Sequence, residues 1–193
     1  MEKRVIVITG ASGAGKTTVA NYLTDKYELP KVITHTTRRP RGSEKDGVDY
    51  YFEDQESFEK NHFIERVEFS GKKYGSSHEG LDRAFEQSQN TPHPGLIVIV
   101  VDTVGAITYK NELGSTADIW FITTSDFEEF KGRLVARGDK PEEIEARTQS
   151  EEFERDMVLP AELQEKASII YNDAWDDTTK RVDELFKKLL ETL

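Results

Sequence analysis

The sequence predicts an α/β fold in which a parallel sheet is flanked by helices, with a small antiparallel lobe and a helical lid attached. Two observations lead to this fold class. Short apolar runs rich in β-branched residues alternate with longer segments of helical spacing, which is typical of a doubly wound parallel sheet. Two more polar regions interrupt that alternation. At 193 residues, the chain is long enough for one compact body with small inserted lobes.

The regular elements can be assigned in order along the chain. Apolar runs predict parallel strands at residues 4–9, 96–101, 118–122 and 167–171, with residues 31–34 as a fifth candidate. Helical spacing predicts helices at residues 16–27, 125–137, 141–157 and 177–190. Strands and helices therefore alternate through most of the chain.

The two interrupting regions predict separate lobes. Residues 34–83 hold short, turn-separated strand patterns, which favour a small antiparallel lobe. Residues 125–157 are dense in charge and poor in apolar residues, and a mostly polar helical pair either bridges solvent or moves over a site. We interpret the second region as a mobile lid. The core then comprises residues 1–33, 84–124 and 158–193.

The composition excludes several classes of protein. Asp and Glu outnumber Lys and Arg by 37 to 26, and a net charge of −11 argues against a nucleic-acid-binding surface. No window approaches the roughly 18 uncharged apolar residues of a membrane span. The absence of cysteine excludes disulfides and thiolate–metal sites and suits a reducing compartment. We therefore expect a cytoplasmic protein that binds neither nucleic acid nor membrane.

A glycine-rich loop between the first predicted strand and helix matches the pattern G-x-x-x-x-G-K-[ST]. It consists of Gly10, Ala11, Ser12, Gly13, Ala14, Gly15, Lys16 and Thr17, followed by Thr18. Backbone N–H groups in such a loop hold phosphates, the lysine reaches the β- and γ-phosphates, and the final hydroxyl coordinates Mg²⁺. The alternative is a glycine turn that carries a lysine by chance, but the strand before it and helix after it favour a nucleotide site.

A second phosphate site is predicted by arginines that lie close together in an acidic chain. Arg38, Arg39 and Arg41 fall within four positions, and Pro40 fixes the turn between them. Arginine grips phosphate through a planar fork, and a tyrosine hydroxyl such as that of Tyr50 or Tyr74 adds a neutral donor. The alternative is a solvated basic loop, which is less plausible in a chain that also carries a phosphate-binding loop.

Polar residues of the same region can read a purine base. One carboxylate, such as that of Glu65, accepts both the N1–H and N2–H₂ donors of guanine. The hydroxyls of Thr34 and Ser76 can serve O6 and N7. Any one of these side chains alone is more simply explained as the polar face of a strand. As a set, they predict a guanine site.

These motifs, in this order, resemble the guanylate kinase family. The likeness rests on Ser-Gly-Ala-Gly-Lys-Thr, Thr-Thr-Arg-x-Pro-Arg, Gly-x-Asp-Tyr-x-Phe, Phe-Ile-Glu and Tyr-Gly-Ser-Ser, and extends over about residues 4–173. It implies a P-loop kinase core with a parallel sheet, an antiparallel GMP-binding lobe and a helical lid. The implied reaction is ATP + GMP → ADP + GDP with Mg²⁺, and we expect dGMP to be accepted too.

The resemblance also implies roles for individual residues. The GMP phosphate would be held by Arg38, Arg41, Tyr50 and Tyr74, and guanine by Thr34, Glu65 and Ser76, with Asp102 near the base or the metal. ATP would bind the glycine-rich loop through Thr18, with Asn172 nearby and Thr17 on Mg²⁺. The catalytic set would be Lys16, Arg38, Arg137 and Arg147, the last two supplied by the lid.

Several positions depart from the family pattern. Val100 and Val104 stand where the family usually carries an aspartate and a glutamine, with Thr103 between Asp102 and Val104. Lys73 replaces a common tyrosine and Ala136 a glycine, and Thr34 replaces a serine but keeps its hydroxyl. These changes could slow the enzyme or relax its choice of base. Each phosphate-binding residue remains.

Two alternatives stay open from the sequence. The protein could phosphorylate another small phosphorylated acceptor, against which stands the guanine site around Glu65. It could also be a non-catalytic binding module of the same fold. Such modules typically lack a working glycine-rich loop or lid arginines, whereas Lys16, Thr17, Arg137 and Arg147 are present here. The sequence is compatible with a monomer or a homodimer.

Overall fold

The computed structural model describes residues 3–69, 71–136 and 138–193. Within them, a parallel sheet has the order β6-β1-β7-β8. Its strands are β1 (Arg4–Thr9), β6 (Leu96–Val100), β7 (Ala117–Thr123) and β8 (Ala167–Tyr171). The four assigned strands of the predicted core are confirmed, and the sequence order β1, β6, β7, β8 requires crossovers on both faces.

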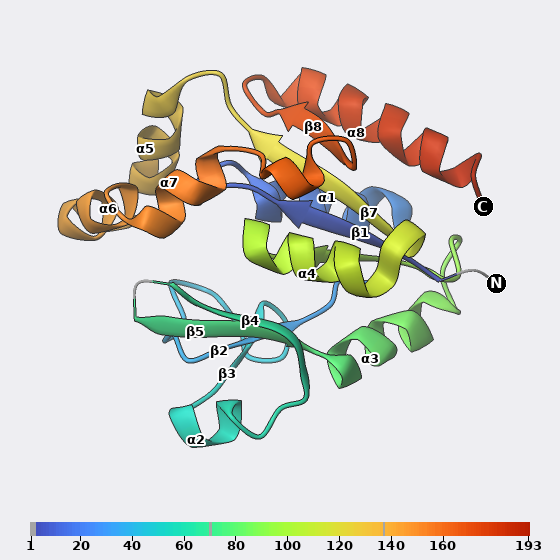
Figure 1. Ribbon diagram of the computed structural model, residues 1–193, viewed down its shortest axis with the longest axis horizontal. Helices are drawn as coiled ribbons and strands as arrows, with labels where there is room; N and C mark the ends of the chain where they lie inside the picture. The colour runs from blue at the N-terminus through green and yellow to red at the C-terminus, as the bar shows by residue number, and fades with distance from the viewer. Residues whose placement is uncertain (1–2, 70, 137) are drawn as a thin grey trace.

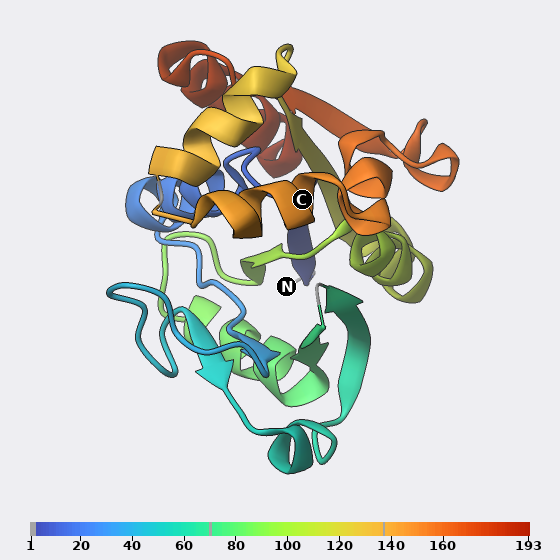
Figure 2. The ribbon, with the colours of Figure 1, turned by 90° about the vertical axis from the view of Figure 1, so that its left-hand side faces the viewer.

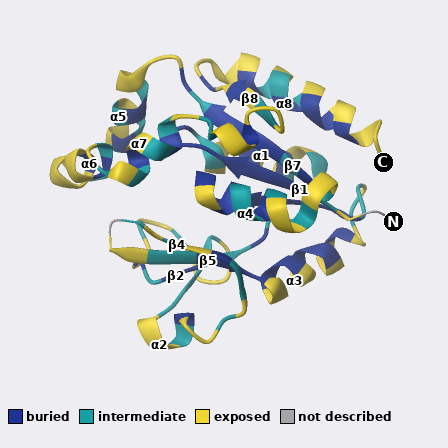
Figure 3. Ribbon diagram, viewed as in Figure 1, coloured by how far each residue is buried: buried dark blue, intermediate teal, exposed yellow. Residues whose placement is uncertain are grey.

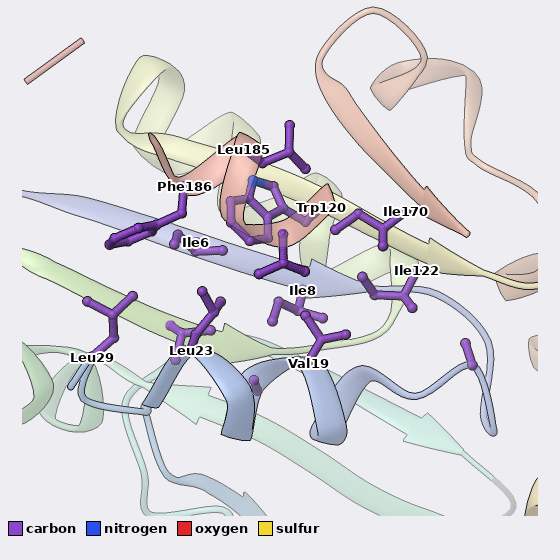
Figure 4. Close-up of a cluster of buried hydrophobic side chains, with 14 of the residues drawn as sticks. Ile6, Ile8, Val19, Leu23, Leu29, Trp120, Ile122, Ile170, Leu185 and Phe186 are labelled. Carbon is purple, nitrogen blue, oxygen red and sulfur yellow. The ribbon is translucent and has the colours of Figure 1, made fainter. Parts of the chain in front are cut away.

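Helices cover both faces of this sheet (Figure 1). They include α1 (Lys16–Tyr27) and α8 (Trp175–Leu190) on one face, and α3 (His78–Ser88) and α4 (Thr103–Leu113) on the other. Side chains alternate along β1: Ile6 and Ile8 pack against α1 and α8, as Figure 4 shows, whereas Val5 and Val7 pack against α3 and α4. This period of two explains the unbroken apolar run of a doubly covered strand. Figure 3 shows the resulting buried centre.

A second sheet has the order β3-β2-β5-β4. Its strands are β2 (Thr34–Thr36), β3 (Tyr50–Phe52), β4 (Phe63–Phe69) and β5 (Lys72–Ser77), and the short helix α2 (Gln55–Phe58) follows β3. The β2–β5 and β4–β5 pairs are antiparallel, and the edge strand β3 runs parallel to β2. In the view of Figure 2, this sheet lies at the bottom of the molecule, below the helices α5 (Phe127–Ala136), α6 (Pro141–Thr148) and α7 (Glu151–Met157).

The third group comprises α5 (Phe127–Ala136), α6 (Pro141–Thr148) and α7 (Glu151–Met157). The single helix predicted over 141–157 is wrong, because the chain breaks between α6 and α7. Ser150 caps the new helix by accepting a hydrogen bond from the Phe153 N–H at 3.2 Å. Two 3-10 turns, η1 (Gly114–Thr116) and η2 (Ala161–Leu163), complete the assigned elements of the described residues.

The fifth core strand predicted at residues 31–34 is also wrong. Lys31 makes one isolated parallel bridge to Val98, and the chain then crosses to the second sheet, where Thr34 begins β2. The apolar character of this segment is explained by Val32, whose side chain is buried in the hydrophobic core on the α3 and α4 side of the parallel sheet. None of the helices in the described part of the chain combines the length and the apolar character that a membrane crossing requires.

Candidate active site

The glycine-rich loop joins β1 to α1 and has the backbone that its glycines permit. Gly10, Gly13 and Gly15 have φ values of 131°, 89° and 98°, in the region that favours glycine. A Cβ at Gly10 would lie 2.1 Å from the Ile122 carbonyl oxygen, so no other residue fits there. Lys16 Nζ donates to the Gly10 and Ala11 carbonyl oxygens at 2.6 and 2.9 Å, which holds the ammonium over the loop.

Thr17 and Thr18 lie exposed in the first turn of α1, next to the positive end of the helix dipole. Among the described residues, no cluster of three or more His, Asp or Glu side chains is arranged to hold a metal ion. A site made of one threonine hydroxyl fits Mg²⁺, which keeps several waters and is bound mainly through substrate phosphates.

Asn172 and Arg133 support the glycine-rich loop by donating hydrogen bonds to its backbone. Asn172 Nδ2 donates to the Ala14 carbonyl oxygen at 2.8 Å, and the Thr178 hydroxyl orients the amide by donating to Asn172 Oδ1 at 3.0 Å. Arg133 Nη1 donates to the same Ala14 oxygen at 3.2 Å, and Nη2 donates to the Asn172 carbonyl oxygen. The sequence predicts Asn172 near this side but gives no role to Arg133. The spacing of four residues between Arg133 and Arg137 in the sequence is the signal that could have found Arg133.

Arg147 reaches the same loop from α6. Its Nη1 donates to Ser12 Oγ at 3.2 Å and pairs with Asp139 at 3.1 Å, and the residue is buried. A buried guanidinium beside a phosphate-binding loop can neutralise charge on a bound nucleotide. The other predicted lid arginine, Arg137, lies outside the described residues.

Arg38 lies in the second sheet region and is held in a defined orientation. Its guanidinium forms a two-pronged ion pair with Glu44, at 2.8 and 3.0 Å, and lies 5.2 Å from the ring centre of Tyr50. The Tyr74 ring packs edge-on against Tyr50 at 6.3 Å. Burial raises the pKa of Tyr50, so its hydroxyl remains a neutral donor. Three of the four residues predicted to hold the GMP phosphate therefore lie together.

Arg41 and Thr34 are placed by the backbone around this group. The Arg41 N–H donates to Glu44 Oε2 at 2.7 Å, so Glu44 ties Arg41 to Arg38 through its carboxylate. Thr34 pairs with Tyr50 in the β2–β3 register. The sequence did not single out Glu44 as a site residue, although its spacing from the arginines is visible in the chain.

Glu65 and Ser76 face each other across the β4–β5 pair. Ser76 Oγ donates to Glu65 Oε1 at 2.8 Å, and the Tyr109 hydroxyl donates to Ser76 Oγ at 2.9 Å. Burial raises the pKa of Glu65 to about 7, and the nearby Asp102 adds to the rise. Tyr109 comes from α4 and is fully buried, and sequence reasoning missed it because a lone tyrosine in a helix carries no motif.

Asp102 caps α4, its Oδ1 accepting a hydrogen bond from the Gly105 N–H at 2.7 Å. Burial raises its pKa, Asp156 raises it further, and Arg155 and Lys16 oppose the rise. A Cβ on Gly105 would lie 3.1 Å from Glu65 Oε2 and 3.2 Å from Asp102 Oδ1. Gly105 therefore lets these two carboxylates lie beside the same turn, and the Asp102 carboxylate also interacts electrostatically with Lys16 of the glycine-rich loop.

The family model for guanylate kinase matches residues 2–189. The chain belongs to the guanylate kinase family. A guanylate kinase of Bacteroides thetaiotaomicron is 34% identical over 98% of this chain and 91% of its own length. One from Thermus thermophilus is 36% identical over 80% of this chain and 69% of its own length. A crystal structure of guanylate kinase from Anaplasma phagocytophilum has a TM-score of 0.66 at 23% identity and covers 97% of this chain and 85% of its own, which supports the fold.

Proposed function

We propose that this guanylate kinase family member transfers the γ-phosphoryl group of ATP to GMP, and also to dGMP, forming ADP and GDP. The observation that supports the proposal is the presence of two separate groups of side chains suited to binding phosphate, with a buried carboxylate in the same lobe as the second. The first is the loop around Lys16, and the second is the group formed by Arg38, Tyr50 and Tyr74. A phosphotransferase with a phosphate acceptor needs such a pair of sites.

On the donor side, the loop N–H groups and Lys16 would hold the β- and γ-phosphates of ATP. Asn172 supports this assignment, because it fixes the loop through the Ala14 carbonyl. Mg²⁺, held by Thr17 and the ATP phosphates, would neutralise charge on the transferred group.

On the acceptor side, Arg38 and Arg41 would bind the GMP phosphate with Tyr50 and Tyr74 as neutral donors. Glu65 would accept from the guanine N1–H and N2–H₂ groups, with Thr34 and Ser76 on O6 and N7, and with Asp102 close to the base. The burial of the Glu65 carboxylate against Ser76 supports this role, because the donors of a bound base would replace the water that the carboxylate loses on folding.

The chemistry needs positioning and charge neutralisation more than a general base, because the acceptor phosphate is already an anion. Lys16, Arg38 and Arg147 would neutralise charge that is shared between the two phosphates in the transition state, together with Arg137. We propose that residues 125–157, which include α5–α7, close as a lid over the reacting groups and exclude water. Residues 34–83 would form the GMP-binding lobe, and the remaining residues the core. We further propose a cytoplasmic location, which the absence of cysteine supports.

The test is ADP release, coupled to NADH oxidation, with Mg-ATP and a panel of GMP, dGMP, AMP, CMP and UMP. We expect kcat/KM for GMP to exceed the value for each non-guanine nucleotide by at least about 100-fold, since a site built on base hydrogen bonds rejects bases that leave its polar groups unpaired. Comparable low rates with all five nucleotides would overturn the proposal and point to a different acceptor.

A further inference from the structure

An ion-pair network joins α7 to the start of α4. Arg155 Nη2 donates to Asp102 Oδ2 at 2.7 Å, and Arg155 Nε donates to Asp156 Oδ1 at 2.9 Å. Asp156 Oδ1 in turn accepts from the Thr103 hydroxyl at 2.5 Å and faces the Thr103 N–H at 3.4 Å. Two consecutive residues of α7 thus hold two consecutive residues at the start of α4, and Figure 1 shows these helix ends side by side.

The network is buried at its acidic end. The side chains of Asp102 and Asp156 are 12% and 5% exposed, whereas that of Arg155 is 34% exposed. A buried carboxylate that loses its partner is costly, because its charge then lacks both water and a counterion. Arg155 lies between the two acids, so its positive charge offsets their mutual repulsion.

The charged groups that face Asp102 come from several elements. Arg155 and Asp156 belong to α7, Glu65 belongs to β4, and Lys16 lies at the start of α1. Asp102 Oδ1 is fixed by the Gly105 N–H and Oδ2 by Arg155, so each oxygen has one defined donor. The orientation of the carboxylate beside Glu65 therefore depends on Arg155.

This network lies where the chain departs from the pattern of its family. Val100 and Val104, on either side of Asp102, have apolar side chains, and neither can orient the carboxylate by hydrogen bonding. Thr103 supplies a hydroxyl, which Asp156 accepts. Residues of α7 thus provide the polar partners at this turn.

We propose that Arg155 is a positioning residue for guanine recognition: it fixes Asp102 beside Glu65 and links the end of the lid segment to the base site. This inference rests on the proposed function, since it assumes that Glu65 and Asp102 face the base. Arg155 acts through Asp102. Its removal should therefore weaken binding of GMP and discrimination between GMP and IMP, whose base lacks the N2 amino group.

The test compares Arg155→Gln and Arg155→Lys with the wild-type enzyme, using KM and kcat for GMP, IMP and ATP. The matched control is Arg181→Gln, which removes an exposed arginine paired with Glu184 on α8. We expect Arg155→Gln to raise KM for GMP by about 10-fold, to change KM for ATP by less than about 2-fold, and to reduce the GMP-over-IMP preference. Arg155→Lys should recover part of both losses, because it restores the charge. Arg181→Gln should behave as wild type.

Binding of GMP alone, measured by calorimetry, separates recognition from lid closure and turnover. We expect the same loss of GMP affinity in Arg155→Gln without ATP present. The inference is overturned if the wild-type enzyme uses GMP while Arg155→Gln keeps the wild-type KM and GMP-over-IMP preference. It is also overturned if both variants lose ATP and GMP use equally, which is the signature of a general folding defect. Failure of the proposed function is a different result: the wild-type enzyme itself shows no GMP-dependent ADP release.

Discussion

Ser76 donates a 2.8 Å hydrogen bond to Glu65 across the β4–β5 pair, inside a site where Glu65 is almost completely buried. The bond stabilises the ionised carboxylate, but burial outweighs it and raises the pKa of Glu65 to about 7. The folded protein therefore holds a carboxylate whose charge is costly in the absence of a ligand, and in the proposed guanine site this charge would pair with the base donors.

The first prediction concerns the pH dependence of stability. The pKa of Glu65 is about 7 in the folded state, compared with an ordinary value of 4.5. Between these two pH values, Glu65 is therefore more often protonated in the folded state than in the unfolded state. Stability from this group is therefore present at low pH and is lost as the pH rises through the folded pKa. Relative to Glu65→Gln, the wild-type free energy of unfolding should fall by about 2.5 kcal/mol between pH 5 and pH 8.5. Urea unfolding of both proteins measures it, and a pH-independent difference contradicts it.

The second prediction concerns Tyr109, whose hydroxyl donates to Ser76 at 2.9 Å in the core. Tyr109→Phe keeps the ring but leaves Ser76 without this donor. We expect a loss of about 1 kcal/mol in stability and a several-fold rise in KM for GMP, with KM for ATP little changed. Tyr171→Phe, at an exposed position of β8, is the matched control. Equal kinetics for the two variants would show that Tyr109 has no effect on the base site.

The third prediction concerns Gly105, which gives room to Glu65 and Asp102. A Cβ there would lie 2.9 Å from Val101 Cβ and close to both carboxylates. We expect Gly105→Ala to destabilise the protein and raise KM for GMP, because the turn and the carboxylates must shift. Gly132→Ala, in α5 with nothing within 4 Å of the added carbon, should instead stabilise by about 0.5–1 kcal/mol through helix propensity. Thermal unfolding of both variants distinguishes crowding from propensity.

The sequence predicts the parallel core well because each of its strands has a local signature. An apolar run such as residues 4–9 is buried on both faces, and the glycine-rich loop after it has a fixed spacing. Residues 31–34 have the same apolar character, but the bridge at Lys31 ends after one pair and Thr34 joins another sheet. Partner choice of this kind depends on tertiary contacts that a local pattern does not contain.

The predicted site residues form recognisable motifs. Of the residues that sequence reasoning missed, Glu44 contacts its neighbours Arg38 and Arg41, whereas the others act through long-range contacts. Tyr109 reaches Ser76 from 33 residues away, and Arg155 reaches Asp102 from 53. Arg133 meets Ala14 across 119 residues. A single sequence shows none of these pairings, because each depends on how helices dock onto the sheet. The break between α6 and α7 is different, since a serine before an acidic run is a local helix-start signal at Ser150.

The last prediction separates the two phosphate sites. Lys16 belongs to the loop after β1, and Arg38 lies in the lobe with Glu44 and Tyr50. Lys16→Ala should reduce kcat by at least about 10³-fold and leave the GMP dissociation constant within about 2-fold, because the lysine acts on ATP phosphates. Arg38→Ala should raise the GMP dissociation constant at least about 10-fold, through loss of a charged contact, with ATP affinity little changed. Calorimetry with each nucleotide measures both constants. If either variant lost ATP and GMP binding equally, the two sites would not be independent, because the removed side chain would then contribute to the binding of both nucleotides.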